Sequence, residues 1–270
     1  MKRSWSFYNS GSGFFAHNTG SGTLHSNNAV GEQYNATGPQ YNHFNYYESP
    51  FSRTDQERER LEREKNDCLR SLSFNAIHIR RDKIPPAHPS TCEWIRETAK
   101  FRQWRDRTDL SRHNAVLWIK GHPGTGKSTL MKHIWSYCQR ELQARTTAAY
   151  FFHARGDLLE KTPLGMIRSL VCQLLMEEES TYQHFLPLFR RKKQLHIKLE
   201  WGEAELQEFL LSEMQTYQGK PLVLLVDALD ECSELQVQDV VDFLELLSIT
   251  YIRHGLNVSI CLSSRHYPNM

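Results

Sequence analysis

The residues that most constrain the fold of this chain are 121–128, with the sequence Gly-His-Pro-Gly-Thr-Gly-Lys-Ser. They match the pattern G-x-x-x-x-G-K-[S/T], in which a glycine-rich loop cradles phosphate groups. Residues 115–120, before the loop, are short and apolar and predict a buried strand. Residues 129–135, after it, carry apolar side chains at helical spacing. This strand, loop and helix context argues against a chance glycine-rich turn.

The residue types in the loop suit a phosphate ligand. The glycines are expected to adopt positive φ and let the backbone approach the ligand closely. Backbone N–H groups and the positive end of the following helix then face the anion. A lysine supplies a charge for the outer phosphates, and a serine hydroxyl suits Mg²⁺. The predicted nucleotide-binding residues are Gly121, His122, Pro123, Gly124, Thr125, Gly126, Lys127, Ser128 and Thr129.

A second segment predicts the other half of the site. Residues 222–226 form a continuous apolar run, typical of a strand buried on both faces, and Asp227 follows directly. Ligands bind at the carboxyl ends of parallel strands, so Asp227 is expected to share Mg²⁺ with Ser128. A strand-end cap is the alternative for Asp227 alone. Asp230 or Glu231 is predicted to orient or deprotonate an attacking water.

Further elements complete the predicted sheet. Residues 146–152 and 257–262 predict strands, and helices are expected at 162–175, onward through about 214, and at 237–250. Arg265 follows the last strand and is predicted to sense the outer phosphate as a third catalytic residue, with a surface arginine as the alternative. The expected fold is a three-layer α/β P-loop domain with a parallel sheet.

Composition limits the classes of partner. A net charge of +2 over 270 residues gives no basic footprint for nucleic acid. The six cysteines are scattered without zinc spacing, which favours reduced thiols and a cytoplasmic location. No apolar run reaches the ~20 residues that span a bilayer, and no signal peptide is evident.

The first 50 residues differ from the rest. Residues 4–47 are rich in Asn, Gly, Ser and Tyr, with a weak nine-residue repeat that places Asn9, Asn18 and Asn27 in register. Such a segment cannot bury enough apolar surface to fold alone, so we expect disorder in the monomer. A flexible leader and a self-templating cross-β motif are both compatible with it.

Residues 51–90 connect the leader to the predicted domain. Charges alternate from 55 to 70, including an i,i+4 pair of Glu59 and Arg63, which predicts a solvated connector helix; the segment is too short for a full coiled coil. The prolines of 79–89 predict an extended path. Ser90 or Thr91 is then expected to cap an amphipathic helix that carries Trp94, Ile95, Phe101 and Trp104.

Several motifs together resemble a known family. They are 91–94 (Thr-Cys-Glu-Trp), 117–121 (Leu-Trp-Ile-Lys-Gly), 126–132, 227–231 (Asp-Ala-Leu-Asp-Glu) and 263–265 (Ser-Ser-Arg). Over about residues 68–270 the chain resembles the nephrocystin-like NACHT domains of fungal nod-like receptors, which belong to the signal-transducing (STAND) P-loop ATPases. The leader is loosely similar to amyloid-type signalling motifs that precede some of these domains.

The resemblance implies a switch driven by ATP or GTP with Mg²⁺, slow hydrolysis, and a role in fungal immunity, heterokaryon incompatibility or programmed cell death. It implies self-association through the nucleotide domain and possibly through residues 1–50, with a cell-death effector downstream. The expected domains are a leader at 1–50, a charged entry segment at 51–90, and a C-terminally truncated NACHT domain at 91–270. A turnover NTPase, or a polymerising scaffold with a vestigial P-loop, are the alternatives.

Overall fold

The computed structural model describes residues 50–74, 78–88, 91–195, 199–213, 217 and 219–266, and two short leader strands. It divides into two units, residues 1–49 and 50–270. In the first unit, β1 (His17–Asn18) pairs antiparallel with β2 (Leu24–His25). The other leader residues, and with them the predicted disorder or self-templating repeat, lie outside the described residues.

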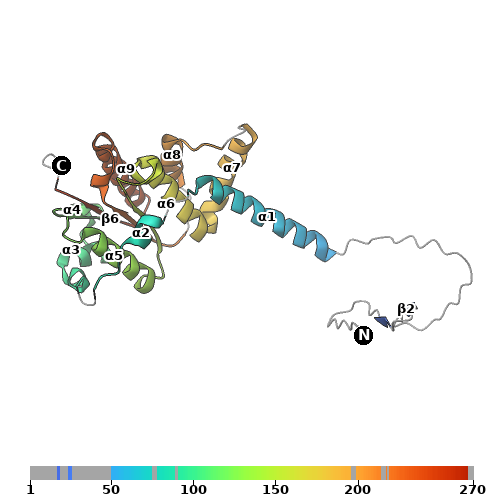
Figure 1. The fold of residues 1–270 in the computed structure, drawn as a ribbon, viewed down its shortest axis with the longest axis horizontal. Coiled ribbons are helices and arrows are strands. Elements are labelled where there is room, and N and C mark those ends of the chain that lie inside the picture. Colours follow the sequence, from blue (N-terminus) through green and yellow to red (C-terminus); the bar gives the residue numbers. More distant parts are fainter. Residues whose placement is uncertain are drawn as a thin grey trace, which may run out of the picture. The chain divides into compact units, whose positions relative to one another are not determined.

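The second unit is built on a parallel sheet (Figure 1). Its described strands are β3 (Val116–Lys120), β4 (Thr146–Phe151), β5 (Leu222–Asp227) and β6 (Val258–Ser264), in the order β3-β6-β5-β4. Every residue of β4, β5 and β6 is buried, as their continuous apolar runs predict. The prediction of a buried strand is wrong for most of β3, because this strand lies at one edge of the described sheet and only its residue Leu117 is buried.

Two apolar layers cover the sheet. Val223 and Leu225 of β5 pack with α3 (Ala99–Asp106) and α5 (Lys127–Glu141). The alternate residues of β5 pack on the other face with α6 (Pro163–Glu177), α7 (Glu179–Leu195), α8 (Glu203–Glu213) and α9 (Glu234–Arg253). This helix, sheet and helix sandwich confirms the predicted three-layer α/β architecture of the P-loop type.

The charged helix is confirmed as α1 (Pro50–Leu72), with Arg63 and Glu59 paired at 2.8 Å. It is not a solvated connector along its whole length. Cys68 and Leu72 are completely buried in the core, and Arg168 of α6 donates to the Leu72 carbonyl at 3.0 Å. The last turns of α1 are therefore part of the folded domain.

The entry segment departs from the sequence prediction in two places. Residues 79–83 form a short helix, α2 (Ile79–Lys83), and the extended path begins only at Ile84, where the following proline disfavours helical backbone. The next helix, η1 (Glu93–Glu97), has Cys92 at its N-cap position, so the predicted cap by Thr91 is wrong; Ser90 lies outside the described residues. The Thr91 hydroxyl donates to the His88 carbonyl instead.

The predicted amphipathic helix is interrupted at Thr98. This residue ends η1 and caps α3, where its hydroxyl accepts a hydrogen bond from the Phe101 N–H at 3.3 Å. Phe101 and Trp104 are buried, and the Trp104 indole donates to the Ile260 carbonyl at 2.9 Å. Trp94, on η1, is 55% exposed rather than core-facing.

Replacing Thr98 with Ala is expected to lower the free energy of unfolding by about 1 kcal/mol, because the N-terminal N–H groups of α3 lose their cap. Urea denaturation of the whole chain measures the change. The matched control is Thr98→Ser, which keeps the hydroxyl and should stay close to the parent. Equal losses in the two variants would show that the methyl group, and not the cap, stabilises this turn.

The remaining described elements are α4 (Leu110–His113), η2 (Leu158–Lys161) and η3 (Leu229–Glu231). Among the helices that the structure describes, none is both long enough and apolar enough to cross a bilayer. All six cysteines are buried free thiols, and burial raises the pKa of Cys68 and Cys138 to about 12.

Candidate functional site

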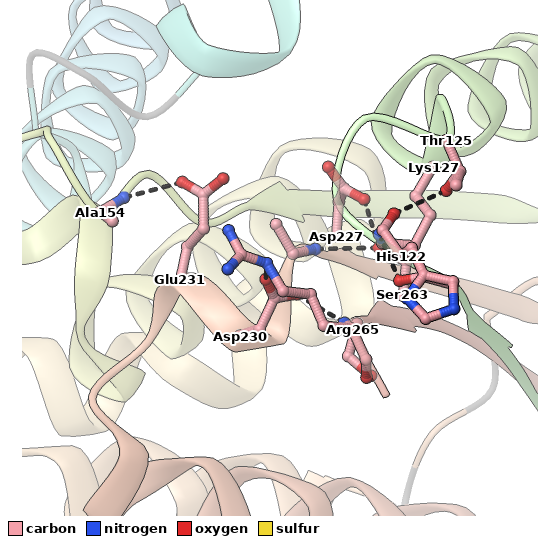
Figure 2. Close-up of polar contacts among 12 residues, drawn as sticks. His122, Thr125, Lys127, Ala154, Asp227, Asp230, Glu231, Ser263 and Arg265 are labelled. Carbon is pink, nitrogen blue, oxygen red and sulfur yellow. Dashed lines mark hydrogen bonds and ion pairs between the residues drawn. The ribbon is translucent and has the colours of Figure 1, made fainter. Parts of the chain in front are cut away.

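The glycine-rich loop connects β3 to α5 at the carboxyl end of the sheet (Figure 2). Gly124 and Gly126 have φ of 78° and 81°, a conformation that a side chain would strain. Gly121 does not share it, so the prediction of positive φ is wrong there. Its small size matters for packing, since an added Cβ would lie 3.1 Å from the Thr125 hydroxyl.

The side chain of Lys127 closes the loop. Its Nζ donates to the carbonyls of Gly121 at 2.8 Å and His122 at 2.9 Å (Figure 2). The Thr125 hydroxyl donates to the same His122 carbonyl at 2.8 Å. The Gly121 N–H donates to the backbone carbonyl of Ser264, in β6, at 3.2 Å. The loop is thus fixed in shape by its own bonds and by the neighbouring strand.

Asp227, at the end of β5, is completely buried. Its Oδ1 accepts a hydrogen bond from the Ser263 hydroxyl, which in turn accepts from the Ala228 N–H at 3.0 Å. Its Oδ2 has no hydrogen bond of ordinary geometry. Burial raises the pKa of Asp227, and the hydroxyls of Ser128 and Ser263 oppose this rise.

These residues suit a magnesium ion. An unpartnered carboxylate oxygen beside the Ser128 hydroxyl offers the hard oxygen ligands that Mg²⁺ prefers. Within the described ranges, no group of three or more His, Cys, Asp or Glu side chains could hold a metal. Water and phosphate oxygens would complete the shell, as is usual for Mg²⁺, and the ion would neutralise phosphate charge.

The two acids of η3 are held by arginines. Asp230 accepts from the Arg265 N–H at 2.9 Å and pairs with its guanidinium at 2.7 Å. Glu231 accepts from the Ala154 N–H at 2.8 Å and lies 3.6 Å from the guanidinium of Arg80 (Figure 2 shows the first contact). Both carboxylates are therefore already engaged, and neither is a free base in this conformation.

A pocket of about 230 Å³ is lined by most of the predicted site residues. Gly121, His122 and Thr125 do not line it but build the loop, and Asp227 lies behind the lining residue Ser263. Sequence reasoning missed Arg80 and Ala228 and gave Ser263 no role. The available signal was that Ser263 directly follows the predicted strand at 257–262, as Asp227 follows the apolar run at 222–226. The lining residues are Arg80, Pro123, Gly124, Gly126, Lys127, Ser128, Thr129, Ala228, Asp230, Glu231, Ser263 and Arg265.

Comparisons with known proteins agree with this geometry. Residues 90–265 match the family described as Nephrocystin 3, N-terminal. The chain is also 26% identical over 179 residues, 66% of its length, to the vegetative incompatibility protein HET-E-1 of Podospora anserina. It spans only 12% of the length of that relative. The predicted resemblance to a NACHT-type domain is thereby confirmed, and the chain belongs to the nephrocystin 3 N-terminal family.

Proposed function

We propose that the pocket binds ATP or GTP together with Mg²⁺ and that the chain is a nucleotide-dependent signalling switch of the NACHT type. The observation that carries this proposal is that the Ser128 hydroxyl, at the end of the glycine-rich loop, lies beside the buried carboxylate of Asp227, whose Oδ2 has no hydrogen bond of ordinary geometry. Gly124, Gly126, Lys127 and Ser128 would hold the phosphates, and Ser128 with Asp227 would hold the metal.

Slow hydrolysis fits the site better than rapid turnover. A general base must be free to take a proton from water, whereas Asp230 and Glu231 are each paired with an arginine. Steady-state phosphate release well below 1 s⁻¹ is therefore expected, in contrast to the ~1–100 s⁻¹ of kinases. A rate inside that range would contradict the switch and favour a turnover NTPase.

The biological role proposed is signalling in fungal self/non-self recognition, heterokaryon incompatibility or programmed cell death. Its support is the name of the relative, a vegetative incompatibility protein, and the shared family. Buried free thiols favour the cytoplasm. Partners would be further copies of the chain, through the nucleotide domain and the leader, and a downstream cell-death effector.

Calorimetric titration of the whole chain with ATP, GTP and ADP, each with and without Mg²⁺, tests the proposal. We expect saturable binding of at least one triphosphate, strengthened by Mg²⁺. The same titrations decide the base preference. Absence of binding by every nucleotide would leave the polymerising scaffold as the better explanation.

A further inference from the structure

Arg80 enters the pocket from outside the family match. It lies on α2, ten residues before that match begins, yet it lines the pocket with Lys127 and Ser128. Its side chain is 30% exposed. The buried Nε atom has no hydrogen-bond partner, which is costly for a polar group without a ligand.

The helix that carries Arg80 is fixed to the helix that follows the loop. Lys132 of α5 donates to the carbonyls of Ile84 at 2.5 Å and Asp82 at 3.3 Å. Arg81 stacks over the Trp135 ring of α5 at 4.3 Å. Because α5 also begins with Lys127 and Ser128, α2 and the phosphate-facing residues form one framework.

The contact that Arg80 makes now is a weak one. Its guanidinium lies 3.6 Å from Glu231, whereas Arg265 approaches Asp230 to 2.7 Å and also bonds it through the backbone. Guanidinium groups bind phosphate through short, often paired, charge-assisted hydrogen bonds. A phosphate in the pocket is therefore a better partner for Arg80 than Glu231 is.

We propose that Arg80 contacts a phosphate of the bound nucleotide and leaves Glu231 when it does so. This rests on the proposed function and extends the site to a segment before the family domain. Binding of a nucleotide would then change the contacts of Arg80, and so of α2, directly. Glu231 would lose the arginine but keep the hydrogen bond that it accepts from the Ala154 N–H, so it would still not be a free base.

The test compares Arg80→Gln with Lys83→Gln by calorimetry on the whole chain. Lys83 is exposed on the same helix and is not among the pocket residues. Its variant therefore removes an equal positive charge without changing the pocket. Arg80→Gln should weaken Mg²⁺–ATP and Mg²⁺–tripolyphosphate binding about tenfold, the size of one charged hydrogen bond. Lys83→Gln should change both less than twofold.

The outcomes separate this inference from the function on which it rests. A parent chain that binds no nucleotide overturns both, whereas equal binding by the parent and Arg80→Gln overturns only the role of Arg80. A loss for ATP without a loss for tripolyphosphate would place Arg80 at the nucleoside and overturn the phosphate contact.

A further variant guards against a purely structural effect. Glu231→Gln removes the present partner of Arg80 but keeps an acceptor for Ala154, and should bind both ligands more tightly than the parent because no carboxylate then competes with phosphate for Arg80. A loss equal to that of Arg80→Gln would show that the ion pair itself shapes the pocket.

Discussion

Replacing Lys127 with Ala is expected to weaken Mg²⁺–nucleotide binding roughly 30- to 100-fold. The Nζ group sits 2.8–2.9 Å from two loop carbonyls, at the end of a flexible four-carbon stem that would let it turn to the phosphates. Hydrogen bonds to charged groups contribute about 1.5–3 kcal/mol, and each 1.4 kcal/mol is a tenfold change in affinity. Calorimetric titration with the triphosphate that the parent binds measures the loss.

Two further variants separate the loss of the Lys127 amine from a general loss of charge and from the loss of the aliphatic stem. Lys120→Ala removes the same charge two positions before His122, where the ammonium lies over the Trp118 ring at 3.9 Å and outside the pocket. Its affinity should match the parent. Lys127→Met keeps the aliphatic stem and should lose as much as Lys127→Ala. Binding within threefold of the parent in both Lys127 variants would rule out the proposed phosphate role.

Local patterns predicted the sheet well because each buried strand is a self-contained apolar run. Residues 222–226 needed no long-range information to be recognised. The strand order is different, since it depends on pairing between segments that are distant in the sequence, such as Val116 of β3 with Ile260 of β6. Nothing local indicated that β6 separates β3 from β5, which is what brings Ser263 between the loop and Asp227.

The helix at residues 79–83 was missed because a local signal was applied too widely. We expected the prolines at 85 and 86 to exclude a helix from the residues before them. A proline restricts the backbone mainly at its own position and at the residue before it, and α2 ends at Lys83, before both. Five residues are too few for a helix to be stable alone. Lys132 and Trp135 of α5 hold α2 in place, and the sequence of 79–83 carries no sign of either contact.

In the predicted site, too, local patterns identified the residues but not the contacts between distant segments. The motif spacing identified Lys127 and Ser128, and the strand end identified Asp227, because these residues follow local rules. Whether Asp230 and Glu231 are free or paired depends on Arg265 and Arg80, which come from distant segments. Their catalytic assignment stays a prediction, and the phosphate-release rate tests it.

Replacing Asp227 with Asn is expected to stabilise the nucleotide-free chain by about 1–3 kcal/mol at neutral pH and to remove the Mg²⁺ dependence of binding. The carboxylate is buried with one oxygen unpartnered, and keeping such a group ionised costs this much or more. Asn keeps an acceptor for the Ser263 hydroxyl and carries no charge. It is a much poorer magnesium ligand, so the stability gain and the binding loss arise from the same atom.

The stability difference between the parent and Asp227→Asn should depend on pH in a predictable direction. Burial raises the pKa of Asp227 in the folded chain above its unfolded value, so the folded chain holds this proton more tightly. The parent therefore gains stability relative to Asp227→Asn as the pH falls through the raised pKa. Urea denaturation without nucleotide should show the largest difference at neutral pH and a diminishing one toward acid pH.

Asp230→Asn is the matched control. It removes an acid only three residues away, but this acid is paired with Arg265 at 2.7 Å, so the variant should lose stability instead of gaining it. It should keep the response to Mg²⁺. If Asp227→Asn unfolded at lower urea than the parent at neutral pH, the carboxylate would have to be stabilised in the empty site. The unpartnered oxygen would then not be evidence of a cation position.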